Sequence, residues 1–449
     1  MIALRLSEIA AALGVPAPGA DPIIDSIVAD SRKVDYGSLF AALPGSQVDG
    51  HDFAAKAVGM GALAVLVNRP LALPVPQLVV SDVLVALGQI ASMLRQRLNP
   101  RVVGITGSNG KTTVKEMLAS ILRQQGEVLA TQGNYNNELG VPLTLFRLEP
   151  QHRFAVLEMG ASKAGDIAYL TRIALPEIGL ITNIGPAHLE GFGSEEGVAR
   201  AKGEIYASLP ADGCAILNGD QPWCALWRAL NSAGRVLTFG AAEGLEVRLE
   251  IDGKLTRIRT PDGAFEMRLT LPGRHNLVNA AAAAAAAIAL DVPLEKIRSG
   301  LEAVKPVPGR LNLIQVDSGW TVIDDTYNAN PASLYSALQV LAGMQGTPWL
   351  VLGDMKELGE DSRKLHAEVG DAARSLGVSR IFAIGEMAAL TVDAFGTGAQ
   401  HFSNRASLVE ALKRELRPGI NCLVKGSRSM GMEHVVREVA APRSMKEAC

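Results

Sequence analysis

Apolar and polar positions alternate along this chain in the rhythm of strands followed by helices. Short apolar runs are typical of buried strands, and longer segments with apolar residues every three or four positions are typical of amphipathic helices. This pattern predicts strands at 101–106, 154–158, 178–183 and 214–217, with helices at 111–125, 166–173 and 195–208. Strands that alternate with helices indicate a mostly parallel sheet covered by helices.

Before this region the pattern is different. Residues 1–82 alternate short helices with β-rich runs at 63–67 and 77–80, and a helix rich in Leu and Ala then leads to Asn99-Pro100. After the middle region, residues 245–271 indicate short strands joined by turns, and a helix with eight consecutive alanines, Ala280 to Ala287, follows. The chain therefore changes character before and after one central α/β unit.

A segment with two prolines and a glycine separates a last series of strands and helices. Lys305-Pro306-Val307-Pro308-Gly309 is the best hinge candidate, because this composition suits a stiff linker. Beyond it we expect strands at 320–324, 348–353, 380–384 and 420–425. The sequence thus predicts an α/β protein of three domains, which we place at residues 1–82, 83–310 and 311–449.

Composition supports several cores and excludes some partners. The 449 residues suggest about three domains. Lys and Arg number 43 and Asp and Glu 46, so there is no global basic field to hold nucleic acid or an anionic membrane. The four cysteines form no CxxC pair, and the longest apolar run, 280–290, is shorter than the ~20 residues that span a bilayer. We expect a soluble, cytoplasmic monomer that contains no inserted segment.

A glycine-rich turn joins strand 101–106 to the next helix. Gly104-Ile-Thr-Gly107-Ser108-Asn109-Gly110-Lys111-Thr112-Thr113 lies where backbone N–H groups and a helix N-terminus can hold phosphate oxygens. Lys111 would contact the β- and γ-phosphates, and Thr112 would offer its hydroxyl to Mg²⁺. The usual first glycine is replaced by Ile105, so this is a variant loop. The alternative is a glycine-rich turn with no ligand.

At this point the residues resemble a known family. The loop is similar to that of the Mur ligases and of folylpolyglutamate synthase, and the similarity extends through most of the chain. The motifs that resemble the Mur ligase that adds D-alanyl-D-alanine are Thr131-x-x-Asn134-x-Asn136-Asn137-x-x-Gly140-x-Pro142, Leu157-Glu158-Met159-Gly160, Asp324-Asp325-Thr-Tyr-Asn-Ala-Asn-Pro331, Leu352-Gly-Asp-Met-x-Glu-Leu-Gly359 and Lys425-Gly-Ser-Arg-Ser429. The resemblance implies an N-terminal UDP-sugar-binding α/β domain, a central P-loop ATPase domain with a mostly parallel sheet, and a C-terminal Rossmann-like domain.

The resemblance also implies an ATP and metal site. Glu158 would bind Mg²⁺ beside Thr112, and His188 and Lys202 match the family's second-metal histidine and a lysine carbamylated by CO₂. The loop residues 107–113 would bind ATP together with Asn279, Arg310 and Asp325. Without the family, Glu158 would be a solvated or structural residue at a strand end and His188 a hydrogen-bonded loop histidine. Arg310 would be a linker charge and Lys202 a solvated helix cation.

Substrate contacts follow from the same resemblance. Ser31 and Arg32 match the UDP-muramoyl domain, Asn134, Asn136 and Asn137 offer amides to a peptide, and Lys425 and Ser427 suit a dipeptide carboxylate. The implied reaction joins D-alanyl-D-alanine to UDP-N-acetylmuramoyl-tripeptide through an acyl phosphate. The alternatives are another Mur-type or folylpolyglutamate-type ligase, or a P-loop NTPase regulator. Each of these substrate motifs could also be an ordinary solvated turn.

Overall fold

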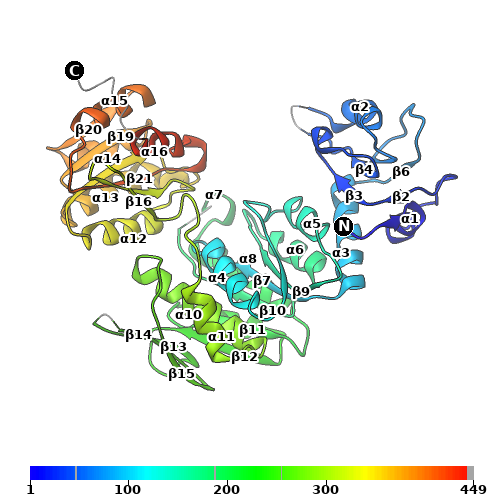
Figure 1. Cartoon of the computed structure of the whole chain (residues 1–449), viewed down its shortest axis with the longest axis horizontal. Coiled ribbons are helices and arrows are strands. Elements are labelled where there is room, and N and C mark those ends of the chain that lie inside the picture. Colours follow the sequence, from blue (N-terminus) through cyan, green and yellow to red (C-terminus); the bar gives the residue numbers. More distant parts are fainter. Residues whose placement is uncertain (46–47, 187–188, 254, 442–449) are drawn as a thin grey trace.

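The chain folds into three α/β parts arranged side by side (Figure 1). The computed structural model describes residues 1–45, 48–186, 189–253 and 255–441. In the view of Figure 1 the N-terminal part lies at the right, the C-terminal part at the left, and the central part between and below them. Within the described part, no helix is long and apolar enough to cross a membrane.

The N-terminal part contains two small sheets. Strands β1 and β2 pair antiparallel, and the other four strands are parallel in the order β3-β4-β5-β6. Their bounds are β1 (Leu4–Arg5), β2 (Ile23–Ile24), β3 (Ser26–Val28), β4 (Ser38–Ala41), β5 (Ala64–Val67) and β6 (Gln77–Val79), with helices α1 (Leu6–Leu13) and α2 (Ala54–Gly59).

The central part is a nine-stranded sheet in the order β15-β14-β13-β12-β11-β10-β7-β9-β8. Strands β7 to β13 are parallel, and β14 and β15 add an antiparallel edge. The strands are β7 (Arg101–Thr106), β8 (Glu127–Ala130), β9 (His152–Glu158), β10 (Ile178–Ile181), β11 (Cys214–Asn218), β12 (Arg235–Gly240), β13 (Val247–Asp252), β14 (Leu255–Thr260) and β15 (Gly263–Met267). The helices are α4 (Lys111–Leu122), α5 (Gly140–Leu145), α6 (Asp166–Ala174), α7 (Leu189–Phe192), α8 (Glu195–Ala207), α9 (Cys224–Leu230), α10 (Arg274–Ala289) and α11 (Leu294–Glu302).

The C-terminal part is a six-stranded sheet in the order β16-β17-β21-β18-β19-β20, in which only the pairing of β16 with β17 is antiparallel. Its strands are β16 (Asn312–Gln315), β17 (Thr321–Asp325), β18 (Thr347–Gly353), β19 (Arg380–Ile384), β20 (Ala399–Phe402) and β21 (Ile420–Lys425). Its helices are α12 (Pro331–Ala342), α13 (Ser362–Ser375), α14 (Ala388–Phe395), α15 (Arg405–Glu415) and α16 (Glu433–Ala440). The α/β class with mostly parallel sheets and three domains is therefore confirmed.

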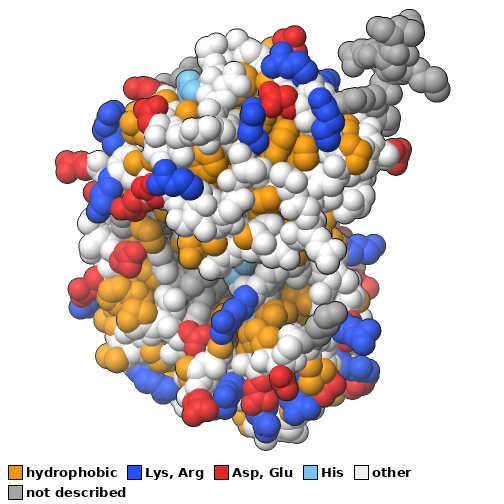
Figure 2. Space-filling model, turned by 90° about the vertical axis from the view of Figure 1, so that its left-hand side faces the viewer, with side chains coloured by type: hydrophobic (Ala, Val, Ile, Leu, Met, Phe, Trp, Pro, Cys, Tyr) orange, Lys and Arg blue, Asp and Glu red, His pale blue; other side chains and the backbone are white. Residues whose placement is uncertain are grey.

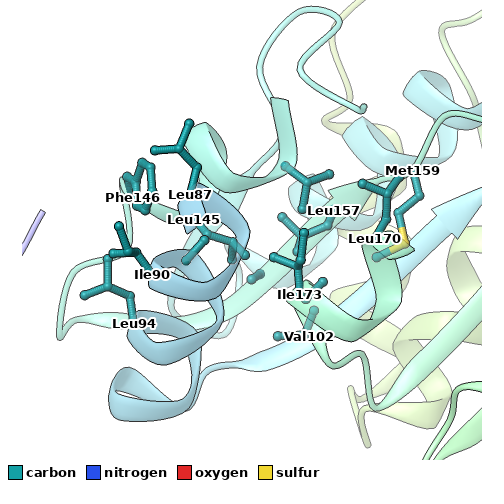
Figure 3. Packing of buried hydrophobic residues seen from close by; sticks show 14 of the residues in the cluster. Leu87, Ile90, Leu94, Val102, Leu145, Phe146, Leu157, Met159, Leu170 and Ile173 are labelled. Carbon is teal, nitrogen blue, oxygen red and sulfur yellow. The ribbon is translucent and has the colours of Figure 1, made fainter. Parts of the chain in front are cut away.

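Helix α3 (Val83–Leu98) joins the N-terminal and central parts through one apolar core. Leu87, Ile90 and Leu94 extend from it on the side of Phe146, which follows α5, whereas Leu170 and Ile173 of α6 lie on its other side (Figure 3). The same cluster of buried residues contains Leu6 and Ile9 of α1, so α3 has an apolar contact on both sides. The sequence pattern predicted this helix. It did not show that the helix would pack against both the N-terminal and the central part.

The surface charge agrees with the balanced composition. On the face drawn in Figure 2, Lys and Arg side chains lie among Asp and Glu over both its upper and lower parts. This face therefore has no broad basic patch of the kind that holds a polyanion. Any phosphate must be bound by a small local group of residues.

Candidate active site

The glycine-rich turn lies between β7 and α4, as the sequence predicted. Gly107 has φ 143° and Gly110 has φ 81°, a region that side chains other than glycine rarely adopt. A Cβ at Gly107 would overlap the hydroxyl of Thr182, so glycine is required there for space as well. The turn thus brings its backbone close to the end of β10 and leaves the first N–H groups of α4 free for an anion.

Lys111, the first residue of α4, folds back over this turn. Its Nζ donates to the carbonyl oxygens of Gly107 at 2.8 Å and Ser108 at 3.4 Å. The side chain is half-buried rather than exposed, and burial lowers its pKa, while the Glu158 carboxylate opposes that shift. The ammonium is therefore held at the mouth of the loop, where phosphate oxygens could replace the two carbonyls.

The residues after β10 brace the turn. Asn183 Oδ1 accepts from the N–H of Asn109 at 3.0 Å, and its Nδ2 donates to the Asn109 carbonyl at 3.0 Å. Thr182 Oγ1 donates to the same carbonyl at 2.6 Å. The prediction extended this strand to 183, whereas it ends at Ile181, and the N–H of Thr182 still donates to the carbonyl of Thr106 at 2.9 Å. Asn183 is a site residue that the sequence did not single out.

A buried carboxylate lies beside the loop. Glu158, at the end of β9, is 2% exposed, and its Oε2 accepts from Thr112 Oγ1 at 2.6 Å. Its Oε1 accepts from Asn136 Nδ2 at 2.8 Å. A buried carboxylate next to a hydroxyl presents the hard oxygen ligands that Mg²⁺ prefers.

The described residues offer no ready-made cluster of metal ligands here. In the regions that the structure describes, no group of three or more His, Cys, Asp and Glu side chains converges. The donor set at Glu158 therefore fits Mg²⁺, which is usually held by one or two carboxylates together with substrate phosphates and water.

Arg310, the last residue of the central domain as bounded above, and residues of the C-terminal part reach the same loop. Arg310 Nη2 donates to Thr112 Oγ1 at 2.7 Å, and its guanidinium lies 4.1 Å from the centroid of the Tyr327 ring. Asn330, the N-cap of α12, donates to Asn109 Oδ1 at 2.8 Å. Tyr327 and Asn330 lie within the motif at 324–331, and the sequence did not predict a site role for either.

Asp325 and Lys425 form a buried ion pair at the ends of two adjacent strands, β17 and β21. Asp325 also accepts from the N–H of Leu311 at 3.1 Å, and Lys425 donates to the carbonyl of Asn328 at 3.0 Å. Both side chains line the cleft described below. The pair lies at the carboxyl end of the sheet, where ligands of open α/β sheets bind.

Lys202 is buried within the central part. It is 2% exposed, and its ammonium lies 5.7 Å from the centroid of the Phe192 ring. Burial lowers the pKa of Lys202 to about 7, with a further lowering from Lys111 and an opposing effect from Asp166. The interpretation as a solvated helix cation is therefore wrong, because the side chain is buried.

These side chains line one cleft of about 670 Å³ between the central and C-terminal parts. The predicted residues that line it are Gly107, Ser108, Asn109, Gly110, Lys111, Thr113, Asn134, Asn136, Asn137, Glu158, Lys202, Asn279, Arg310, Asp325 and Lys425. The hydroxyl of Thr112 is hydrogen-bonded to Glu158 and Arg310, which both line the cleft. His188 falls outside the residues that the structure describes.

Besides Thr112, three predicted residues are not among the described residues that line this cleft. Ser31 is buried in the N-terminal part, and the adjacent Arg32 is exposed and forms a bidentate pair with Asp30 at 3.0 and 2.9 Å. Ser427 is buried, and its hydroxyl accepts from the N–H of Lys356 at 2.8 Å. The link from the N-terminal part toward the cleft is Lys33, which contacts the hydroxyl of Tyr135 at 3.5 Å.

Three family models match the chain. They are described as the Mur ligase middle domain at residues 105–287, the Mur ligase glutamate ligase domain at 309–428, and the Mur ligase family catalytic domain at 23–125. Each match includes part of the site described above.

Individual proteins match over nearly their whole length. The UDP-N-acetylmuramoyl-tripeptide–D-alanyl-D-alanine ligase of Escherichia coli (strain K12) is 44% identical, with 97% of this chain and 98% of the relative covered. A crystal structure of MurF from Acinetobacter baumannii is 36% identical with a TM-score of 0.90, covering 98% and 99%. MurF from Thermotoga maritima in complex with ADP is 30% identical with a TM-score of 0.83, covering 92% and 97%.

Proposed function

This chain belongs to the Mur ligase family, and we propose on that premise that it joins D-alanyl-D-alanine to UDP-N-acetylmuramoyl-tripeptide at the expense of ATP. It is thereby an ATP-dependent, ADP-forming ligase of peptidoglycan precursor synthesis. The observation that carries this proposal is the meeting of Lys111, Arg310 and the Thr112–Glu158 pair in one cleft between two domains.

The reaction needs cations around the γ-phosphate. The terminal carboxylate of the tripeptide attacks the γ-phosphorus, which gives an acyl phosphate and ADP. The free amine of D-alanyl-D-alanine then attacks the acyl carbon, and phosphate leaves as the amide forms. Lys111 and Arg310 are the cations that would face the charge on the transferred phosphoryl group. Water would hydrolyse the acyl phosphate, which is a reason to assemble the site between two domains.

Thr112 and Glu158 would hold Mg²⁺, which when bound neutralises charge on the phosphates. The direct hydrogen bond of Thr112 to Glu158 keeps two oxygen ligands together, and Asn136 fixes the other carboxylate oxygen. Asn279 and the glycine-rich turn would contact the nucleotide, together with Asp325 from the C-terminal domain.

We further propose that Lys202 carries a carbamate. A neutral amine is needed to react with CO₂, and a pKa of about 7 supplies one. The carbamate would place an anionic oxygen among cations, where an ammonium is repelled by Lys111. His188 is proposed with it as a ligand of a second metal ion.

The substrates would approach from three sides. Asn134, Asn136 and Asn137 would contact the peptide stem, Ser31 and Arg32 the UDP-muramoyl group, and Lys425 and Ser427 the dipeptide carboxylate. Because Lys425 is paired with Asp325, it would bind the dipeptide only as part of that pair. We keep the domain bounds 1–82, 83–310 and 311–449, and propose a cytoplasmic monomer that supports cell shape and division.

One assay tests the function. Phosphate release is measured with ATP, Mg²⁺, UDP-N-acetylmuramoyl-tripeptide and D-alanyl-D-alanine, and each substrate is omitted in turn. We expect release only with the complete set, and a product whose mass equals the tripeptide substrate plus the dipeptide minus water. Release that continues at the full rate without the dipeptide would contradict a ligase and favour an NTPase.

A further inference from the structure

A second lysine of α4 is buried and is not among the described residues that line the cleft, although Glu116, with which it pairs, is. Lys115 follows Lys111 by one helical turn and is 2% exposed, although lysine is almost never fully buried unless it is paired. Its Nζ donates to the carbonyl of Thr131 at 2.6 Å and pairs with Glu116 at 2.6 Å. Such short, charge-assisted contacts are among the stronger hydrogen bonds in proteins. They hold the ammonium in one place.

Thr131 connects this lysine to the site. The residue follows β8 and begins the loop that carries Asn134, Asn136 and Asn137. Its N–H donates to the carbonyl of Val156 at 3.1 Å, and its hydroxyl accepts from the N–H of Glu158 at 3.0 Å. One residue thus receives Lys115 on its carbonyl and fixes the backbone of Glu158 with its side chain.

The contacts form a closed ring through the P-loop helix. Lys115 is bonded to Thr131, Thr131 to Glu158, and Glu158 to Thr112, which lies one turn before Lys115 on α4. Asn136, on the loop that Thr131 begins, bonds the second oxygen of the carboxylate. Any shift of Thr131 would therefore move Glu158 and Asn136 relative to Lys111 and Thr112.

We propose that Lys115 is a positioning residue of the ligase reaction, which holds Thr131 so that Glu158 and Asn136 keep their geometry toward the metal and the tripeptide. The proposal rests on the proposed function. Lys115 itself touches no substrate. Residues that orient a metal ligand from behind typically change metal affinity or activity 10–100-fold when substituted, which sets the size of effect we expect, about tenfold or more.

The test compares two lysines that both bond backbone carbonyls near α4. Lys115→Met keeps the unbranched stem and removes the ammonium. Lys296→Met is the matched control, because Lys296 donates to the carbonyl of Gln124 at 3.0 Å beyond the far end of α4. For each variant we measure kcat, the KM of the tripeptide, and the Mg²⁺ concentration that gives half of the ADP-dependent rise in Tm. The last readout needs no turnover.

We expect Lys115→Met to raise the half-saturating Mg²⁺ concentration and to lower kcat by about tenfold or more, with Lys296→Met unchanged. Thr131→Val, which removes only the hydroxyl, should give the same shift, and the two changes combined should be less than additive. Thr131→Ser, which keeps the hydroxyl, should restore the wild-type value.

Two results would overturn the proposal. One is a lower Tm of Lys115→Met with an unchanged Mg²⁺ requirement and kcat, because that is the mark of a structural lysine. The other concerns the case in which Lys115→Met does not fold. A wild-type Mg²⁺ requirement in Thr131→Val would then contradict the proposal. Failure of the ligase function itself would appear separately, as a wild-type protein that ignores the dipeptide.

Discussion

At the scale of single residues, the site is built from side chains whose polar groups are hydrogen-bonded by neighbours far away in the sequence. Thr112 shows this best: its hydroxyl donates to Glu158 and accepts from Arg310, a residue 198 positions away. Arg310 is in turn stacked on Tyr327. Substitution of any one member therefore alters the partners of the others, and activity should respond more strongly than stability.

Lys111→Ala should abolish turnover while the protein stays folded. The ammonium supplies a point charge to the phosphates, whereas its two bonds join it only to loop carbonyls, which water can bond in its place. Circular dichroism and a thermal melt without nucleotide should stay near wild type, with the exposed Lys56→Ala as control. A large loss of Tm for Lys111→Ala alone would mean that this lysine mainly supports the loop.

Lys202→Ala should be nearly inactive, and added formate should restore part of the activity by occupying the position of the missing carboxylate. Mass spectrometry of the native protein should show a labile gain of CO₂ on this lysine. Arg200→Ala on the exposed face of the same helix, where Arg200 pairs with Glu196, should behave like wild type. Full activity of Lys202→Ala together with an unmodified lysine would refute the carbamate.

At the scale of elements, the alanine-rich helix α10 lets the P-loop helix lie close to it. Ala280 to Ala287 are all buried, and α10 packs against α4 and β12. Small side chains permit this close approach because nothing projects between the two backbones. The position of α4, and with it Lys111 and Thr112, therefore depends on the absence of larger side chains from α10.

Ala283→Leu should destabilise the central domain by about 1–3 kcal/mol, because added methyl groups in a packed core force neighbours to move. It should also reduce nucleotide affinity by displacing α4. Chemical denaturation and isothermal titration with ADP measure the two effects. Ala303→Leu, at an exposed position after α11, provides the control. Equal stability of the two variants would argue against tight packing at α10.

The sequence predicted several strands whose apolar runs are long and buried, and it missed others, among them β12 inside the central sheet and two strands at sheet edges. Strands β7, β9 and β18 were expected because they are continuous apolar segments, whereas β16 and β20 lie at sheet edges and contain exposed residues. The loop, Glu158 and the asparagines could be predicted from motifs. The contacts of Asn183 and Tyr327 could not, because they depend on how separate elements pack.

At the scale of the whole molecule, the proposed nucleotide site lies where two domains meet. Arg310→Ala and Asp325→Asn should each weaken ATP binding or slow ADP formation by about tenfold or more. Asparagine is chosen because alanine would leave the buried Lys425 without its partner. The exposed Asp317→Asn is the control. Wild-type kinetics in both variants would remove the basis for a shared interdomain site.

The shared helix α3 has a consequence for how the protein melts. Its residues belong to one apolar cluster that contains both α1 and the α5–α6 region, while the clusters of the C-terminal domain begin at Leu311 and contain no described residue before it. Loss of α3 would expose both of its neighbours, so the first two domains should unfold as one cooperative unit. Calorimetry without ligands should then give two heat-absorption peaks rather than three. In hydrogen exchange, the most protected backbone amides on the two sides of α3 should show the same free energy of opening.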